Sequence, residues 1–254
     1  MFGLRRWRRR RLKAQPFPAE WLTILERNVP HYRRLSAPDR RELQQHIQVF
    51  LAEKHFEGCG GLTITDEIRV SIAAQACVLL LHRDVDYYPG LLSIVVYPSS
   101  YLAPVSRVLP GGVVSEDVEV RLGESWSRDC VVLSWDDVKR SAGDIHDGRN
   151  VVFHEFAHQL DRAAGRPAGA PVLPQQSMYI AWARVLGESF RALRRAARRG
   201  WPTLLDKYGA KDPAEFFAVA TEYFFEQPDA LKRTHPELYE QLQLFYQQDP
   251  AGDA

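Results

Sequence analysis

Residues 154–158 read His154-Glu155-Phe156-Ala157-His158, and they follow Asn150, a residue suited to cap the start of a helix. On an α-helix, side chains four residues apart lie on one face, so both imidazoles can bind the same zinc ion. Glu155 lies between the two histidines in sequence and can act as a general base toward a water molecule at the metal. The spacing therefore predicts a metal-binding helix that carries its own base.

A catalytic zinc site needs a third protein ligand, and no third histidine follows the motif at the metzincin spacing. His235 is one candidate, in a predicted loop. The helix predicted over residues 213–226 offers three more, Glu215, Glu222 and Glu226, and the first two are seven residues apart on one face. Glu215 is equally suited to the N3 position of a capping box begun by Asp212. Local signals leave both roles of Glu215 open.

Two other polar side chains near the motif, Asp161 and His146, could each either assist a metal site or have an ordinary structural role. Asp161 is seven residues after His154, on the ligand face, where its carboxylate can accept an imidazole N–H and fix the tautomer. The alternative for Asp161 is an ordinary polar residue at the end of the helix. His146 precedes the helix, and we interpret it as a surface histidine rather than a ligand.

Three segments beyond the histidine pair carry a family resemblance: residues 214–219 (Ala-Glu-Phe-Phe-Ala-Val), residues 222–225 (Glu-Tyr-Phe-Phe) and a basic start that runs into Gln-Pro-Phe-Pro at 15–18. Together with residues 154–161 they resemble the Mlc titration factor A (MtfA) family of zinc peptidases over nearly the whole chain, and more distantly the lethal-factor type of toxin peptidases. The resemblance implies one Zn²⁺ per chain, held by His154, His158 and Glu215. It also implies that Tyr208, seven residues before Glu215, points at the metal.

The resemblance implies a regulatory zinc peptidase with aminopeptidase-like activity on peptide substrates. In that mechanism Glu155 is the base, and the phenol of Tyr208 donates a hydrogen bond to the oxyanion. The family is linked to Mlc, a transcriptional repressor of sugar uptake. An alternative function is therefore an anti-repressor binding protein that sequesters a regulator, with hydrolysis secondary. A third is a metal-dependent hydrolase of substrates other than peptides, since the histidine motif alone does not define the substrate.

The hydrophobic periodicity predicts an α+β fold that is mostly helical. The resemblance makes it a zincin-like metallopeptidase core with a small sheet and an N-terminal helical part. The predicted helices are residues 39–50, 65–80, 177–199, 213–226 and 236–248, and the predicted strands are 93–97, 117–122 and 130–135, with a turn at 110–112. The segment 131–135 suits either a core strand or a strand that lines the cleft and pairs with an extended substrate. We expect one domain over residues 16–248, helical to about residue 85, and a frayed end at 249–254.

The charge of the chain is unevenly distributed. Its 33 basic and 32 acidic residues give +1 overall, but seven of the basic residues lie within residues 1–13, which leaves a net charge of −6 on residues 14–254. An acidic body argues against direct nucleic-acid binding as the main function. We expect residues 1–15 to form a basic flexible tail, either solvated or in contact with nucleic acid, an anionic membrane or an acidic partner.

Composition also bears on the cellular compartment. Hydrophobic residues at 45% and charged residues at 26% are typical of globular proteins. Three widely spaced cysteines form no recognisable disulfide framework, which favours a reducing compartment. No apolar run is long enough to span a bilayer, and the basic start lacks the apolar stretch of a signal peptide. We therefore expect a cytoplasmic protein without a membrane span.

Overall fold

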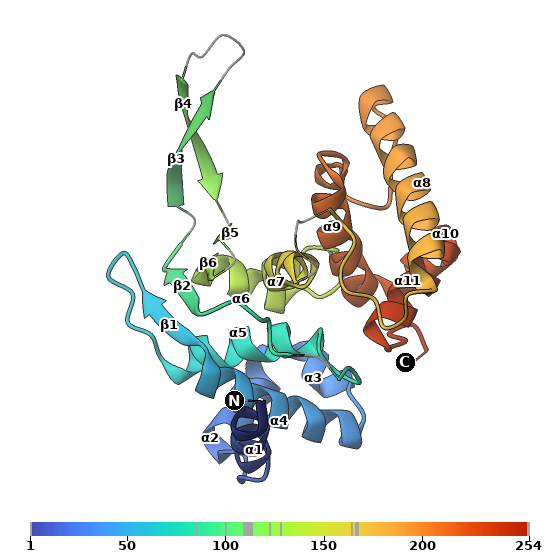
Figure 1. Ribbon diagram of the computed structural model, residues 1–254. Coiled ribbons are helices and arrows are strands. Elements are labelled where there is room, and N and C mark those ends of the chain that lie inside the picture. The colour runs from blue at the N-terminus through green and yellow to red at the C-terminus, as the bar shows by residue number, and fades with distance from the viewer. Residues whose placement is uncertain are drawn as a thin grey trace.

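The computed structural model describes residues 2–84, 86–99, 101–108, 114–121, 123–127, 129–163, 165 and 168–252, and it confirms a mostly helical α+β fold (Figure 1). In chain order the elements are α1 (Phe2–Lys13), α2 (Ala19–Asn28), α3 (Pro30–Arg34), α4 (Ala37–Glu53), β1 (His55–Gly58), α5 (Asp66–Val78), β2 (Ser93–Tyr97), β3 (Tyr101–Val108), β4 (Val114–Arg121), β5 (Gly123–Ser127), β6 (Cys130–Ser134), α6 (Trp135–Gly143), α7 (Val151–Arg162), α8 (Met178–Arg199), the 3₁₀ helix η1 (Lys207–Ala210), α9 (Pro213–Glu226), α10 (Pro228–Thr234) and α11 (Pro236–Tyr246).

The main sheet has the strand order β1-β2-β6-β5. Strands β1, β2 and β6 are parallel, and β5 is antiparallel to β6. Because β6 has a partner on each side, it is not the cleft-lining strand considered above, and β5 occupies that edge instead. The nearly continuous burial of β6 agrees with a central position in a parallel sheet. Of the four strands of this sheet, β1 and β5 were not predicted from the sequence.

Strands β3 and β4 pair as an antiparallel hairpin that extends away from the body of the molecule (Figure 1). The predicted strand at 117–122 corresponds to the second half of β4, whereas the strand predicted at 93–97 is β2 with the same bounds. The turn predicted at 110–112 lies outside the described residues. Since β1 belongs to the main sheet, the N-terminal helical part shares that sheet with the rest of the chain.

Helix α7 lies at the centre of the molecule, between α5, α9 and the sheet (Figure 1). Its apolar side is held by aromatic contacts: the Phe156 ring lies 4.8 Å from that of Tyr88, and the Phe153 ring lies 5.2 Å from that of Phe225, measured between ring centres. Burial of such large rings contributes most of the packing energy of a core. The motif helix is thus fixed on several sides.

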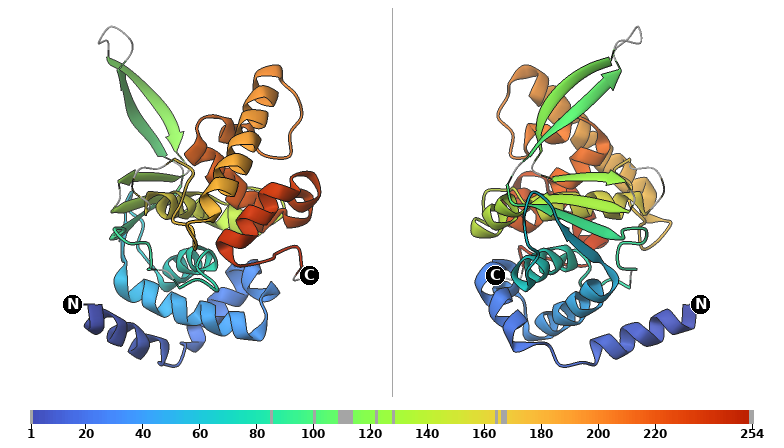
Figure 2. Two further views of the ribbon diagram at one scale, coloured as in Figure 1. Left: turned by 45° about the vertical axis from the view of Figure 1, so that its right-hand side comes forward. Right: turned by 90° about the vertical axis from the view of Figure 1, so that its left-hand side faces the viewer.

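The N-terminal residues form a helix instead of the expected flexible tail. Helix α1 lies beneath α4, at the end of the molecule opposite the β3–β4 hairpin (Figure 2). Arg9 pairs with Glu53 through its Nε at 2.8 Å and also with Asp86. These distant acidic groups hold the basic segment in place, which explains why the local charge pattern predicted a tail.

The C-terminal end is ordered further than expected. Asp249 accepts a 2.6 Å hydrogen bond from the hydroxyl of Tyr239, and that hydroxyl accepts one from the backbone N–H of Ala251 at 3.0 Å. Residues 249–252 therefore pack against α11 rather than fray. In the part of the chain that the structure describes, no helix is both long enough and apolar enough to cross a membrane.

Asn150 joins three helices at the start of α7. Its side-chain oxygen accepts from the backbone N–H of Phe153 at 2.9 Å, which is the predicted N-cap. Its side-chain nitrogen donates to Gln75 of α5 and to Glu226 of α9, at 3.0 and 3.1 Å. Its backbone N–H donates to Glu222 of α9 at 2.7 Å. Because Asn150 is fully buried, losing any of these partners would leave a polar group unsatisfied.

Glu226 makes this junction sensitive to pH. Burial raises the pKa of Glu226 to about 9, although the hydrogen bond from Asn150 opposes the shift, so the folded protein holds a neutral acid at pH 7. The unfolded chain releases this proton near pH 4.5. Between pH 4.5 and 9 the folded state therefore binds one proton more than the unfolded state, and Glu226 lowers the free energy of unfolding as the pH rises.

We expect Glu226→Gln, which mimics the neutral acid, to remove this dependence. Its free energy of unfolding relative to wild type should increase with pH by at most about 1.4 kcal/mol per pH unit across this window. Urea unfolding of both proteins at pH 6, 7 and 8 measures the difference. Parallel pH profiles would show that Glu226 is ionised in the folded protein.

Candidate metal centre

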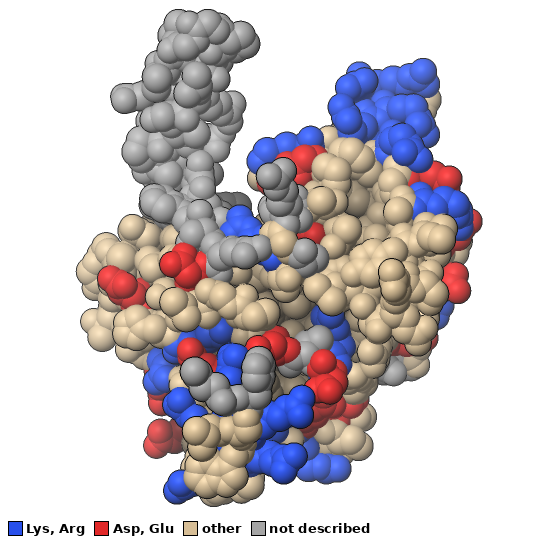
Figure 3. Space-filling model, viewed as in Figure 1, with Lys and Arg blue, Asp and Glu red and all other residues tan. Residues whose placement is uncertain are grey.

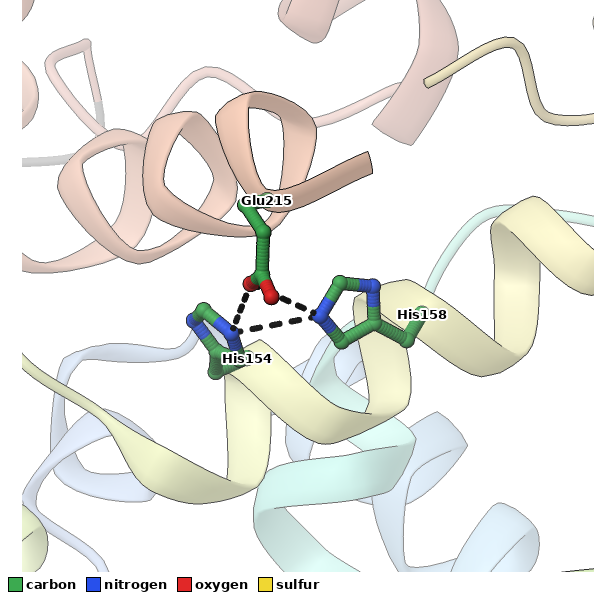
Figure 4. Close-up of side chains that lie close together, drawn as sticks. All are labelled: His154, His158 and Glu215. Atoms are coloured by element: carbon green, nitrogen blue, oxygen red, sulfur yellow. Dashed lines mark hydrogen bonds and ion pairs between the residues drawn. The ribbon is translucent and has the colours of Figure 1, made fainter. Parts of the chain in front are cut away.

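Three side chains from two helices converge on one point (Figure 4). The Nε2 atoms of His154 and His158 on α7 are 3.2 Å apart. Oε2 of Glu215, on the first turn of α9, is 3.1 Å from the first nitrogen and 3.2 Å from the second. The predicted spacing on α7 does place both imidazoles on one face, and the structure selects Glu215 among the four candidates for a third ligand.

This triangle fits a metal ion of the size of zinc. A tetrahedral zinc with ligands at about 2.0–2.1 Å has its ligand atoms about 3.3–3.4 Å apart, close to the three distances observed here. Two imidazole nitrogens and one carboxylate oxygen are also a donor set that zinc accepts in catalytic sites. The three donors leave a fourth tetrahedral position without a protein ligand among the described residues.

The protonation of His154 supports the same interpretation. Its Nδ1 lies 2.7 Å from Oε1 of Glu222, and since a carboxylate only accepts, Nδ1 carries the proton. In the neutral ring Nε2 then carries a lone pair, directed at the point that it shares with His158 and Glu215. Burial disfavours a charged ring, but the carboxylates of Glu222 and Glu215 outweigh burial and raise the pKa of His154 well above its ordinary value. The site therefore attracts a positive charge, which a metal ion supplies.

Glu215 is a ligand candidate and not a capping-box residue. Asp212 caps α9 by accepting from the backbone N–H groups of Ala214 and Glu215, at 2.9 and 3.0 Å. The side chain of Glu215 turns to the histidines instead. Burial would raise the pKa of Glu215, but the two imidazoles lower it strongly, so the carboxylate stays ionised. One residue thus has its backbone in the cap and its side chain in the site.

Glu155, between the two histidines in sequence, is 5% exposed, and its carboxyl interacts electrostatically with both imidazoles and with Glu215. Burial raises the pKa of its carboxyl and Glu215 adds to the effect, while the two imidazoles oppose it. A raised pKa brings a carboxylate closer to the range in which it can accept and release a proton near neutral pH.

Tyr208 and Lys211 contact the second oxygen of Glu215. The Tyr208 hydroxyl donates to Oε1 at 3.2 Å, and Nζ of Lys211 donates to the same atom at 3.0 Å. Burial, followed by the charge of Glu215, raises the pKa of Tyr208, which keeps the phenol protonated. Tyr208 is half-exposed, so its hydroxyl is near the ligands and also near solvent.

Asp161 does not have the role considered for it. Its two oxygens accept from the backbone N–H groups of Gly169 and Ala170, at 2.8 and 2.9 Å, in place of an imidazole N–H. Gly169 has a φ of +68° and could not take a side chain without meeting the backbone oxygen of Pro213. Asp161 therefore fixes the segment that lies against the start of α9.

The other candidates lie away from the triangle. His146 is exposed and contacts Arg34, as expected for a surface histidine. His235 lies between α10 and α11.

The carboxylate that orients the candidate ligand His154 is that of Glu222, for which the sequence indicated only a possible ligand role. Its position seven residues after Glu215 was visible, but the spacing could not show which atom it contacts. Lys211 was also missed. Its only signal was its place four residues before Glu215, a spacing common in surface ion pairs.

We expect Glu222→Gln to weaken metal binding while the fold is kept. Glutamine offers one oxygen where His154 Nδ1–H and the Asn150 N–H need two acceptors, so the ring loses its fixed orientation. Loss of such a partner typically costs 10–100-fold in metal affinity. Competition against a chromogenic chelator measures the affinity, with Glu226→Gln on the same helix as the matched control. Equal affinity in wild type and Glu222→Gln would contradict the orienting role.

Comparisons with known proteins agree with this geometry. Residues 4–247 match the family described as glucose-regulated metallo-peptidase M90. The chain is 40% identical to an uncharacterized protein of Synechocystis sp., over 96% of this chain and 89% of the relative. It is 31% identical to Mlc titration factor A of Klebsiella pneumoniae, over 87% and 84%, and 33% identical to that of Serratia proteamaculans, over 85% and 84%.

The family match spans the helix with the two histidines, the helix with Glu215 and the sheet between the N-terminal helices and α7. Membership of a metallopeptidase family implies a metal cofactor, for which the triangle of donors is the candidate site. The resemblance seen in the sequence is thereby confirmed: this chain belongs to the glucose-regulated M90 family of metallopeptidases, to which it is similar over nearly its whole length.

Proposed function

We propose that this protein is a cytoplasmic zinc-dependent peptidase of the aminopeptidase type, with one Zn²⁺ held by His154, His158 and Glu215. The observation that carries the proposal is the triangle of donor atoms, with sides of 3.1–3.2 Å, beside a buried glutamate. Three unpaired cysteines, Cys59, Cys77 and Cys130, are consistent with a reducing compartment.

The chemistry divides between the metal and two side chains. A bound zinc ion supplies Lewis acidity, which polarises a carbonyl group and lowers the pKa of a water molecule. The carboxylate of Glu155 accepts a proton from the attacking water and transfers it to the nitrogen of the leaving amine. The hydroxyl of Tyr208 donates a hydrogen bond to the oxygen that becomes negative. Lys211 balances the charge of Glu215 without a role in proton transfer.

The edge strand β5 offers a place for the substrate backbone. It is one of the two edge strands of the sheet, and it lies beside α7. An extended peptide can pair with such an edge through its main chain, which makes binding weakly dependent on side chains. This geometry favours peptides over other substrates of a zinc hydrolase.

We expect Glu155→Gln to abolish peptide hydrolysis while zinc remains bound, because the amide keeps the shape of the carboxylate but cannot take the proton. Tyr208→Phe should retain residual turnover, reduced about 100-fold, since it removes only a hydrogen-bond donor. Reporter peptides with free and with acetylated N-termini, assayed on zinc-loaded proteins, measure both effects and the preference for a free amine.

Two results of this assay, and one of the same assay extended to ester substrates, would count against the proposal. Full activity in Glu155→Gln would exclude Glu155 as the base. Equal cleavage of free and acetylated peptides would exclude the aminopeptidase type. Activity on esters without activity on any peptide would show a different hydrolase.

A second role is favoured by the name of the relatives, Mlc titration factor A. We propose that this chain also binds a transcriptional repressor of the Mlc type and that binding does not need hydrolysis. Glu155→Gln and wild type should then capture purified repressor with equal affinity in a pull-down. Failure of both proteins to capture the repressor would remove this role and leave the peptidase proposal untouched.

A further inference from the structure

Helix α1 is attached to the body by one side only. Arg5 pairs with Glu53 at 3.2 Å and with Asp86 at 3.1 Å, and Arg9 pairs with the same two acids. The guanidinium of Arg9 also lies over the ring of Tyr87, 4.7 Å from its centre. These contacts fix the rotation of the helix about its axis, so the side chains on its opposite side have a defined direction.

We define the outer face of α1 as Leu4, Trp7, Arg8, Arg10 and Arg11. Leu4 and Trp7 are 75% and 60% exposed and lie one turn apart. The guanidinium of Arg11 lies 5.9 Å from the Trp7 ring, and helical spacing places Arg8 and Arg10 on the two flanks. Among the described residues, the ion pairs of α1 involve only Arg5 and Arg9. Arg8, at the edge of the outer face, donates a hydrogen bond to the backbone oxygen of Ala52 at 3.4 Å, but no described acidic group pairs with it.

A third apolar side chain extends this surface. Leu92, which precedes β2, is 62% exposed. It lines the same surface depression as Leu4 and Arg8. In Figure 3 the lower end of the molecule, over α1, shows basic patches with uncharged surface between them and acidic patches at the border. Two separate segments therefore present large apolar groups within one basic region.

Arginines beside exposed apolar side chains favour one class of anionic partner over others. A nucleic acid would use the arginines but not the two exposed leucines, and a protein partner would need an acidic surface with apolar pockets matched to side chains from two separate segments. At a bilayer surface, tryptophan and leucine enter the interface while arginines meet anionic headgroups. We propose that the outer face of α1, together with Leu92, binds the surface of an anionic lipid bilayer and attaches the folded protein to it peripherally.

The test uses the full-length protein in vesicle co-sedimentation. Vesicles of phosphatidylcholine mixed with an equal part of phosphatidylglycerol should bind at least about tenfold more protein than vesicles of phosphatidylcholine alone, and high salt should release it. The double variant Leu4→Ala, Trp7→Ala should lose about tenfold in binding with unchanged circular dichroism, because both side chains are largely exposed. No binding of wild type to the anionic vesicles would overturn the proposal.

Two variants that lose the same charge at different places distinguish the effect of the outer face of α1 from the effect of net charge. The triple variant Arg8→Gln, Arg10→Gln, Arg11→Gln should bind anionic vesicles at least tenfold more weakly than wild type. The control changes three exposed arginines of α8 to glutamine, Arg191, Arg195 and Arg198, and should bind like wild type. Equal losses in both triple variants would show that net charge decides. Binding to double-stranded DNA, with vesicle binding unaffected by the Leu4 and Trp7 changes, would assign the face to nucleic acid instead.

Discussion

The carboxylate of Glu222 is the contact on which the site depends. One of its oxygens accepts the Nδ1–H of His154, and the other accepts the backbone N–H of Asn150. The same side chain therefore sets the tautomer of a candidate metal ligand and the position of the first turn of the helix that carries it. Since Glu222 and Glu215 lie two turns apart on α9, one rigid element positions both the third ligand and the support of the first.

Burying an ionised carboxylate without a partner costs free energy, yet four buried glutamates lie in or near α7. Glu155, Glu215, Glu222 and Glu226 are all nearly buried. Each has a separate means of avoiding an uncompensated charge: Glu215 and Glu222 face imidazoles, Glu226 is protonated, and the pKa of Glu155 is raised by burial. Such graded environments let neighbouring carboxyl groups differ in charge at a single pH. The proposed base, Glu155, and the candidate ligand, Glu215, are both glutamates, and their surroundings shift their pKa values in opposite directions.

What the sequence predicts here is local. The caps Asn150 and Asp212 and the bounds of α9 follow from residues within one helical turn, and the structure confirms them. The features that the sequence did not predict depend on contacts between residues far apart along the chain. The pairing of Arg9 with Glu53 spans 44 residues, and it orders a segment whose composition predicts disorder. Glu222 finds His154 across 68 residues, and no spacing rule reveals which atom it will meet. Strand β5 is short and polar, so periodicity alone does not identify the edge of the sheet.

The origin of the ligands has a consequence for the chain as a polymer. His158 and Glu215 are separated by 57 positions, and between them lie α8 and η1. A metal ion that holds both ends closes this loop, much as a disulfide would, and a closure of that length removes about 4 kcal/mol of entropy, expressed as free energy, from the unfolded chain. The stability of the folded protein then follows the free metal concentration. The supply of metal would then govern the lifetime of the folded protein as well as its activity.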